Sequence, residues 1–384
     1  MTAERPGGLT MAPVPAPAGA TLTIDLGAIR RNYRRLRPLA GRAETAAVVK
    51  ADAYGCGIGN VVPALAQDGA RTFFVALIDE AIAARHALEG VPDARVFVLG
   101  GYTPGSAPLL AEHGALPVLG SLPEIEAWLA DGGGPGAALH VDTGMSRLGL
   151  DPAECDAPLV AAFMDRAPPA LLMTHMACAD VTEHPLNRTQ IERFADVRQR
   201  FPDIPASLAN SAALMSGLAH DTALARPGIA LFGGRALDGR DNPMEPVVRV
   251  DARIIQTRNV RAGESVGYGA TWTAHRDRRI AVVSIGYADG YLRAATGGNG
   301  RPAGYAAIGG ARVPLVGRVS MDLIALDVTE LAPEQCTAGM TVEMLGPTVT
   351  VDDVADAAGT IGYEILTNLG SRYHRVIVDT EAER

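Results

Sequence analysis

The chain is poor in cysteine and has no long apolar run. Its 384 residues include only four cysteines, which are widely scattered and form no CxxC pair. This distribution offers neither a disulfide framework nor a zinc cluster, and it suits a reducing compartment. No window reaches the roughly 18 uninterrupted apolar residues that a membrane span requires. The sequence therefore argues against a disulfide-stapled scaffold, a membrane-spanning protein and a metal centre.

The chain also lacks an excess of basic residues. Its 34 Lys and Arg stand against 43 Asp and Glu, which gives a formal net charge of -9. Such an acidic balance argues against nucleic acid as a partner. The first twenty residues are rich in Pro, Ala and Gly, and they lack the basic start and apolar stretch of a secretory signal. We interpret residues 1–20 as a disordered leader and expect a cytoplasmic protein.

The chain does contain a repeated alternation of strand and helix patterns. Its length exceeds the size at which a single core stops growing, so two domains are expected. Up to about residue 245, short apolar runs alternate with longer stretches of helical period, as in repeated βα units. The expected strands cover residues 46–50, 73–77, 94–100, 115–120, 138–143, 171–176, 206–211 and 223–228, and the clearest helix covers 78–90.

Eight strands are the number that closes a (β/α)8 TIM-type barrel. The alternative, a doubly wound open sheet, is weakened because no GxGxxG motif follows the first strand. Beyond residue 245 the pattern becomes β-rich with glycine-rich connectors, and we expect one short helix, in 348–359. The sequence thus predicts an α/β protein, with a barrel over residues 21–245 and a smaller, mainly β domain over 246–384.

Polar side chains recur at the C-terminal ends of the expected barrel strands, where barrel enzymes carry their reactive groups. They are Lys50, Asp142, Arg147, His175, Ser211 and Arg226. Any one of them alone would usually be a solvated loop residue, but five strands that converge on one rim favour a site. A lysine at the end of an apolar strand is partly desolvated, which favours a neutral amine and Schiff-base formation. Nearby turns whose N–H groups can bind phosphate then suggest pyridoxal phosphate.

Nine short segments resemble, in order, the sequence blocks of the alanine racemase family. VVKADAYGCG (48–57) is similar to the family's pyridoxal-phosphate attachment site. The others are VDTGMSRLG (141–149), MTHMACAD (173–180), NSAALM (210–215), RPGIALFG (226–233), VGYGATW (266–272), IGYADGY (285–291), GRVSMDLIALDV (317–328) and IGYE (361–364). The resemblance covers roughly residues 21 to 380, and it implies an isomerase that interconverts L- and D-alanine with pyridoxal 5'-phosphate. It also implies that residues 21–26 pair with the C-terminal β domain rather than with the barrel.

The resemblance assigns two catalytic bases to Lys50 and Tyr268. Lys50 would hold the cofactor and, once the substrate has freed it, act on one face of the substrate. Tyr268 would act on the opposite face from the other subunit, so the resemblance implies a homodimer with shared active sites. Two bases on opposite faces are what racemisation requires. Because a tyrosine ordinarily has a pKa of about 10, His175 and Arg226 are expected to assist Tyr268 through a hydrogen-bonded chain.

The resemblance also implies contacts with the cofactor and substrate. Arg226 would face the pyridine nitrogen, which should stay unprotonated because arginine cannot accept a proton. Arg147 would contact the cofactor's phenolic oxygen and the substrate carboxylate, and the partner's Met321 and Asp322 would help to form the substrate pocket. The phosphate would be held by Tyr54, Ser211, Gly228, Ile229 and Tyr363. Taken alone, Ser211 would more often be a helix N-cap.

One position departs from the family pattern. The family commonly has a lysine, often carbamylated, immediately before the VDTGM block, where its negative charge orients the neighbouring arginine. Here that position is His140. A histidine cannot become a carbamate, so Arg147 must be oriented in another way. A bound anion such as chloride and a hydrogen bond from His140 are the two alternatives.

Three other functions remain open at this stage. A racemase of serine, lysine or several amino acids would differ by only ~1–3 kcal/mol per methylene in its pocket. A decarboxylase or aldolase on the same barrel would not need Tyr268 and would favour an acidic partner at the pyridine nitrogen. A non-enzymatic pyridoxal-phosphate carrier would lack the β domain. The sequence favours an alanine racemase that supplies D-alanine for cell-wall synthesis.

Overall fold

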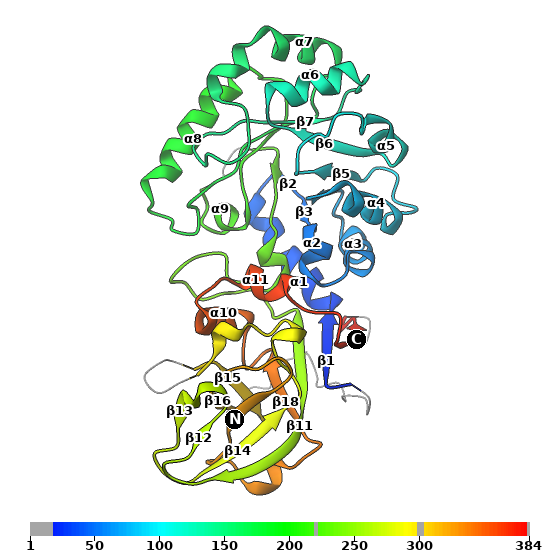
Figure 1. The fold of residues 1–384 in the computed structure, drawn as a ribbon. Helices are drawn as coiled ribbons and strands as arrows, with labels where there is room; N and C mark the ends of the chain where they lie inside the picture. The colour runs from blue at the N-terminus through cyan, green and yellow to red at the C-terminus, as the bar shows by residue number, and fades with distance from the viewer. Residues whose placement is uncertain (1–17, 219–221, 298–302, 382–384) are drawn as a thin grey trace. The chain divides into compact units, whose positions relative to one another are not determined.

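The computed structural model describes residues 18–218, 222–297 and 303–381, which form two compact units (Figure 1). The barrel unit contains residues 30–231 and 235–243, and the β unit contains the other described residues. Residues 1–17 of the expected leader lie outside the described residues. No helix in the described part of the chain is long and apolar enough to cross a membrane.

The barrel unit is built on short parallel strands, and all of them except β2 overlap a strand expected from the sequence. They are β2 (Glu44–Thr45), β3 (Ala47–Val48), β4 (Thr72–Val75), β5 (Arg95–Val98), β6 (Ala115–Leu119), β7 (Ala138–His140), β8 (Leu171–Met173), β9 (Ala206–Ser207) and β10 (Leu224–Ala225). Strands β3 to β9 pair in sequence order, and β10 pairs in parallel with β2.

Backbone hydrogen bonds on both sides of β10 close this sheet into a barrel. The N–H of Arg226 donates to the carbonyl of Ala209 at 2.8 Å, which joins β10 to the chain after β9. On the other side, the N–H of Ala46 donates to the carbonyl of Ala225 at 2.8 Å, between β2 and β3. Since β2 and β3 together form the first strand, the expected eight-stranded α/β barrel is confirmed.

Helices follow the strands and lie around the outside of the sheet (Figure 1). They are α2 (Lys50–Tyr54), α3 (Ile58–Gln67), α4 (Ile78–Ala87), α5 (Ala107–Glu112), α6 (Leu122–Ala130), α7 (Pro158–Arg166), α8 (Pro185–Arg198) and α9 (Ser211–Met215). A further helix, α1 (Leu26–Leu36), comes before the first barrel strand and is divided between the two units. Inside the unit, the fully buried rings of Phe74 and Phe97 stack with their centroids 5.2 Å apart. These apolar strands position the polar residues that follow them.

The β unit has a mainly antiparallel eight-stranded sheet in the order β14-β17-β16-β15-β18-β11-β1-β19, and β11 also pairs with β14. The last pairing closes the strands from β14 to β11 into a ring. The N-terminal strand β1 is antiparallel to β11 and parallel to β19. The strands of this sheet are β1 (Ala20–Asp25), β11 (Val248–Val260), β14 (Arg278–Val283), β15 (Tyr305–Ile308), β16 (Ala311–Val316), β17 (Ile324–Asp327), β18 (Thr341–Leu345) and β19 (His374–Val378). Two further strands, β12 (Ser265–Val266) and β13 (Trp272–Thr273), pair with each other in a separate two-stranded sheet.

The β unit contains α10 (Val351–Ala358) within the segment 348–359 where a helix was expected, and a second helix, α11 (Gly362–Thr367). The prediction of a single helix here is therefore wrong. With six residues and a glycine at its first position, α11 is too short to show a helical period in the sequence. It carries Tyr363, one of the expected cofactor residues.

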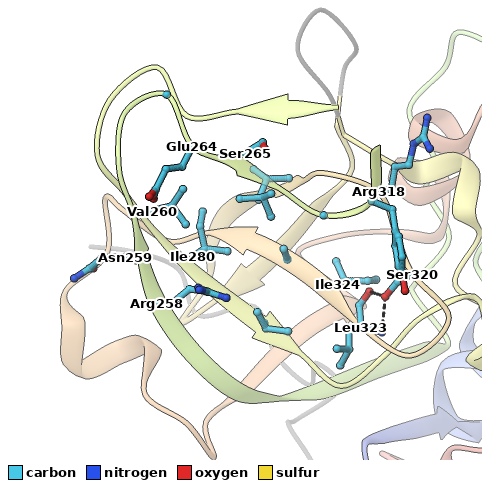
Figure 2. Close-up of a pocket in the computed structure, with 17 residues that line it drawn as sticks. Arg258, Asn259, Val260, Glu264, Ser265, Ile280, Arg318, Ser320, Leu323 and Ile324 are labelled. Atoms are coloured by element: carbon cyan, nitrogen blue, oxygen red, sulfur yellow. Dashed lines mark hydrogen bonds between the residues drawn. The ribbon is translucent and has the colours of Figure 1, made fainter. Parts of the chain in front are cut away.

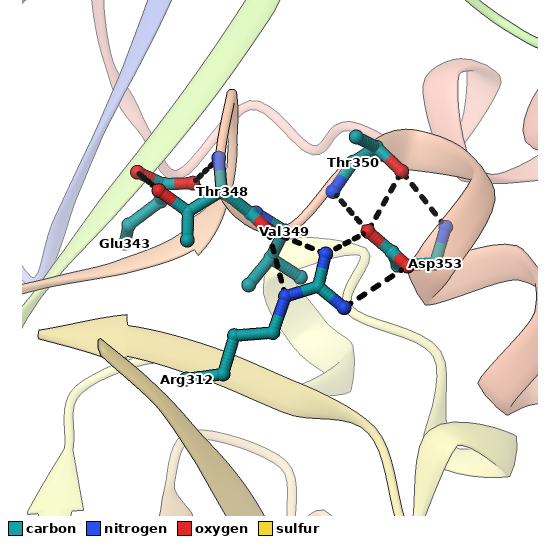
Figure 3. A network of polar contacts seen from close by, with 6 residues as sticks. All are labelled: Arg312, Glu343, Thr348, Val349, Thr350 and Asp353. Atoms are coloured by element: carbon teal, nitrogen blue, oxygen red, sulfur yellow. Dashed lines mark hydrogen bonds and ion pairs between the residues drawn. The ribbon is translucent and has the colours of Figure 1, made fainter. Parts of the chain in front are cut away.

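A polar network fixes the start of α10 (Figure 3). Thr350 and Asp353 form a capping box, in which the Thr350 hydroxyl accepts from the Asp353 N–H at 3.1 Å and the Asp353 carboxylate accepts from the Thr350 N–H at 2.8 Å. Arg312, on β16, forms an ion pair with Asp353 at 2.8 Å. Glu343, on β18, accepts from the N–H of Thr348 at 2.6 Å. The helix is thereby tied to two strands of the sheet.

Gly290 offers a direct test of packing in the β unit. Its φ is +97°, and a Cβ at this position would lie 1.7 Å from the carbonyl oxygen of Asn368. We expect Gly290→Ala to lower the free energy of unfolding by at least ~3 kcal/mol, because overpacking and a left-handed conformation both oppose it. Gly310→Ala is the control, since Gly310 has a similar φ of +84° with nothing within 4 Å. Urea unfolding measures both, and equal losses would contradict the packing argument.

Candidate active site

The C-terminal ends of the barrel strands bring five of the singled-out side chains together. Lys50 follows β3, His140 ends β7, Arg147 lies in the loop after β7, His175 follows β8 and Arg226 follows β10. The side chains of Arg226, Arg147, His140 and Lys50 are all near enough to lower the pKa of His175. A cluster of nitrogen bases from four strands therefore forms at one end of the barrel.

The two imidazoles of this cluster are neutral at neutral pH. Burial, together with the charge of Arg226, lowers the pKa of His140 to about 4. Burial, Arg226 and Arg147 lower the pKa of His175 to about 3. Among the described residues, no group of three His, Cys, Asp or Glu side chains is arranged to hold a metal ion. The arginines and the lysine thus carry the positive charge of the site.

Arg226 is a buried cation held by neutral groups. Its guanidinium donates to the Ser207 hydroxyl and, at 2.6 Å, to the carbonyl of Thr174, and it lies 5.9 Å from the centroid of the Phe74 ring. Burial lowers its pKa to about 10, so it remains charged at neutral pH. No carboxylate in the described part of the chain forms an ion pair with it. A buried guanidinium in this setting favours an anionic or acceptor ligand.

Lys50 is the only lysine of the chain. Its side chain is half-buried, and burial and the nearby Arg147 both lower the pKa of its amine. A larger neutral fraction makes the amine a better nucleophile toward a carbonyl carbon. The four residues that follow, 51–54, all have φ between +52° and +54°, a left-handed turn without glycine. Such a turn costs ~1–2 kcal/mol per residue, so other contacts must stabilise it.

Three further expected residues, Tyr54, Ser211 and Gly228, form a small polar cradle, and Ile229 directly follows Gly228 in the chain. The Ser211 hydroxyl accepts from the N–H of Gly228 at 2.8 Å. A Cβ at Gly228 would lie 2.3 Å from the Tyr54 hydroxyl oxygen, so that hydroxyl packs against the glycine backbone. Ser211 is not the N-cap of α9, because Asn210 takes that role by accepting from the Ala213 N–H at 2.9 Å. Ser211 is therefore available to the cradle, whose hydroxyl and N–H groups suit a phosphate.

The loop that carries Arg147 is shaped by Asp142. The Asp142 carboxylate accepts from the N–H groups of Gly144, Met145 and Ser146 at 2.9, 2.8 and 2.8 Å. Sequence analysis placed Asp142 at a strand end without giving it a role. Among the hydrogen bonds of the described residues there is none between His140 and Arg147. The hydrogen bond considered as a replacement for the missing lysine is thus not formed in this structure.

The β unit carries the remaining expected residues. Tyr268 lies in a 3-10 turn between two glycines of positive φ, and 72% of its side chain is exposed. Met321 is 52% exposed, and Asp322 forms an ion pair with Arg372 at 2.8 Å. Tyr363 lies in α11. Tyr268 lines a groove of about 880 Å³ together with residues that include Arg318, Ser320 and Leu323, three of those labelled in Figure 2.

Sequence analysis missed three groups that support these residues. Ser207 and Phe74 hold Arg226, and Glu80 accepts hydrogen bonds from the backbone beside Lys50. Ser207 could have been found as a polar residue within a buried strand. Glu80 could have been found as an acidic residue in the first turn of the clearest predicted helix. The contact of Phe74 with Arg226 leaves no trace in a single sequence.

The lowered pKa of His140 makes a prediction about stability. The folded protein leaves this imidazole neutral down to about pH 4, whereas the unfolded chain protonates it below about pH 6.5. Stability must therefore fall as the pH drops through that window. We expect His140→Gln to remove part of this loss, up to ~3 kcal/mol at pH 4. Urea unfolding of the wild-type protein and of His140→Gln at pH 7 and pH 4 measures the difference. If both lose the same free energy of unfolding between these pH values, His140 does not have a lowered pKa.

Comparisons with known proteins agree with this geometry. Residues 24–236 match the model of the alanine racemase N-terminal domain, and residues 247–377 match that of the C-terminal domain. An alanine racemase of Methylobacterium nodulans is 51% identical over 94% of this chain and 96% of its own. A catabolic alanine racemase of Mesorhizobium japonicum is 46% identical over 94% of this chain and 93% of its own. The crystal structure of the Bartonella henselae alanine racemase, with covalently bound pyridoxal phosphate, has a TM-score of 0.86 and 36% identity over 94% of this chain and 100% of that one. The chain belongs to the alanine racemase family.

Proposed function

We propose that this member of the family interconverts L- and D-alanine by two-base proton transfer with pyridoxal 5'-phosphate. The observation that carries the proposal is the environment of the only lysine. Lys50 has a lowered pKa, and it lies in a cluster with Arg226, a buried cation that no described carboxylate balances. A lone reactive amine beside such a cation suits a cofactor with an aldehyde carbon and a basic ring nitrogen.

The residues of the barrel fit this cofactor. The hydroxyls of Tyr54 and Ser211 can bind a phosphate, the N–H of Gly228 donates to Ser211 in this structure, and a side chain at Gly228 would collide with Tyr54. Arg226 can donate to the pyridine nitrogen but cannot protonate it. When bound, pyridoxal phosphate supplies an electron sink that stabilises negative charge at the substrate Cα. An unprotonated ring nitrogen weakens that sink, which limits side reactions.

Lys50 and Tyr268 take the proton-transfer roles in this proposal. The Lys50 amine removes or returns the Cα proton on one face of alanine, and the Tyr268 phenol does so on the other. Arg147, on the loop fixed by Asp142, binds the substrate carboxylate. The neutral imidazole of His175 can both donate and accept a hydrogen bond, so it can link Tyr268 to Arg226.

We propose further that the enzyme is a homodimer in which each active site combines the barrel of one copy with the β unit of the other. The exposure of Tyr268, which lines the groove, and of Met321 supports this arrangement, since it leaves both side chains accessible to a second copy. Tyr363 would complete the phosphate contacts, and the partner's Met321 and Asp322 would line the substrate pocket. The proposed setting is the cytoplasm, with D-alanine supplied for the cell wall.

The function is tested with the pyridoxal-phosphate-loaded enzyme and L-alanine in D2O. Loss of optical rotation together with deuterium at Cα of both enantiomers is the expected result, because each base exchanges its proton with solvent. Exchange without racemisation would mean that Lys50 acts as a base and that Tyr268 does not deliver a proton to the opposite face. Faster turnover of serine or lysine under the same conditions would show that alanine is not the substrate.

The shared active site predicts that two inactive variants complement each other. Lys50→Ala lacks the first base and Tyr268→Phe lacks the second. After subunit exchange in a 1:1 mixture, half of the dimers are mixed and each has one complete site, so about a quarter of wild-type activity should return. The control replaces Tyr268→Phe with the Lys50→Ala/Tyr268→Phe double variant, which should restore nothing. If exchanged mixtures stay inactive, the sites are not shared between subunits.

A further inference from the structure

We infer that Glu80 is a positioning residue for Lys50, because its carboxylate clamps the left-handed turn after Lys50 to the end of the neighbouring strand. The inference rests on the proposed role of Lys50, and it gives Glu80 a role that acts through the backbone next to Lys50. It follows from backbone conformation and hydrogen bonds, and the charge of Glu80 adds a second effect.

The turn after Lys50 requires an external support. Ala51, Asp52 and Ala53 have φ and ψ near +52° and +51°, a conformation in which L-residues place Cβ too close to the next carbonyl oxygen. Asp52 stabilises the far end of the turn, since its side chain accepts from the N–H of Ile58 at 2.7 Å. At the end next to Lys50, the N–H of Ala53 donates to the carbonyl of Val49 at 2.9 Å, and the N–H of Ala51 donates to an acceptor outside the turn.

Glu80 supplies that acceptor and uses both of its oxygens. Its Oε1 accepts from the N–H of Ala51 at 2.6 Å, and Ala51 is the residue directly after Lys50. Its Oε2 accepts from the N–H of Ala76 at 2.7 Å and from that of Leu77 at 3.2 Å, immediately after β4. One side chain thus joins the chain after β3 to the chain after β4. It fixes the peptide unit between Lys50 and Ala51, which is bonded to the Cα that carries the Lys50 side chain.

The charge of Glu80 also acts on the amine. The groups that face Lys50 from neighbouring elements are Arg147, after β7, His175, after β8, and Glu80, on α4. Burial and Arg147 lower the pKa of Lys50, and Glu80 is the group that raises it. Glu80 therefore limits how far the lysine's pKa falls while it holds the backbone in place.

The barrel contains a second copy of this clamp, far from the lysine in the sequence. Glu124 occupies the same position in the first turn of α6 as Glu80 does in α4. It accepts from the N–H of Gly120, after β6, at 2.7 Å and from that of Tyr102, in the loop after β5, at 3.1 Å. The two glutamates make the same kind of bond between neighbouring βα loops, but only Glu80 bonds the backbone next to a reactive side chain. Glu124 is therefore a matched control.

The test compares Glu80→Gln with Glu124→Gln in the apoprotein. Because Lys50 is the only lysine, the pH dependence of its acetylation by acetic anhydride, followed by peptide mass spectrometry, reports its pKa without interference from other lysines. We expect the pH at the midpoint of Lys50 acetylation to fall in Glu80→Gln and to stay at the wild-type value in Glu124→Gln. Hydrogen exchange at the Ala51 amide should accelerate only in Glu80→Gln. An unchanged midpoint in Glu80→Gln, or an equal shift in Glu124→Gln, overturns the inference.

Activity of the loaded enzyme separates positioning from general stability. We expect kcat for alanine to fall about tenfold or more in Glu80→Gln with little change in KM, because a misplaced base affects the chemical step. The losses of stability in urea should be similar for the two variants.

If Glu80→Gln does not fold, hydrogen exchange of the Ala51 amide in the wild-type protein tests the clamp instead. We then expect slow exchange of this amide, and fast exchange refutes the clamp. If the acetylation midpoint of Lys50 shifts in Glu80→Gln but the wild-type enzyme does not racemise alanine, the proposed function is contradicted and the inference about Glu80 still holds.

Discussion

The site depends on a buried positive charge that the described part of the protein does not balance. Arg226 lies in the barrel interior with a hydroxyl, a carbonyl and an aromatic ring as its neighbours. Burying a guanidinium in this way is costly, and the cost falls when a ligand supplies an acceptor or a negative charge. Burial lowers the pKa of both nearby histidines, and the charge of Arg226 lowers it further. Burial and this cation together therefore make the site suitable for an anionic aromatic cofactor.

The lysine responds to the same environment, but two groups act on it in opposite directions. Arg147 and burial lower the pKa of Lys50, while Glu80 raises it and holds the adjoining backbone. The barrel therefore sets the pKa of the Lys50 amine and also holds the backbone that positions it. The β unit contributes a different element, the exposed phenol of Tyr268. Racemisation needs these two kinds of group on opposite faces of one carbon.

Much of the fold could be predicted from the sequence because the barrel strands are short apolar runs separated by helical periods. Each of the eight expected runs contains a strand, and the motifs located Lys50, His175 and Arg226 at strand ends. The second helix of the β unit, α11, was missed because six residues carry too little periodicity.

Other features could not be predicted from the sequence for physical reasons. The left-handed turn after Lys50 consists of residues with no preference for that conformation, so only its tertiary contacts explain it. The contact between Tyr54 and Gly228, and the bond from Arg226 to Ser207, join residues far apart in the chain. Such pairs depend on the closed barrel, and spacing along a single sequence does not encode them.

The claim that burial and a buried cation together organise the site is tested most directly by the protonation states of the two histidines in the cluster. Nitrogen-15 chemical shifts of His140 and His175 in the apoprotein at pH 5.5 report whether each imidazole is neutral or charged. The account predicts that both are neutral, because burial and Arg226 hold their pKa values at about 4 and about 3. Imidazolium signals from either residue at that pH would contradict it.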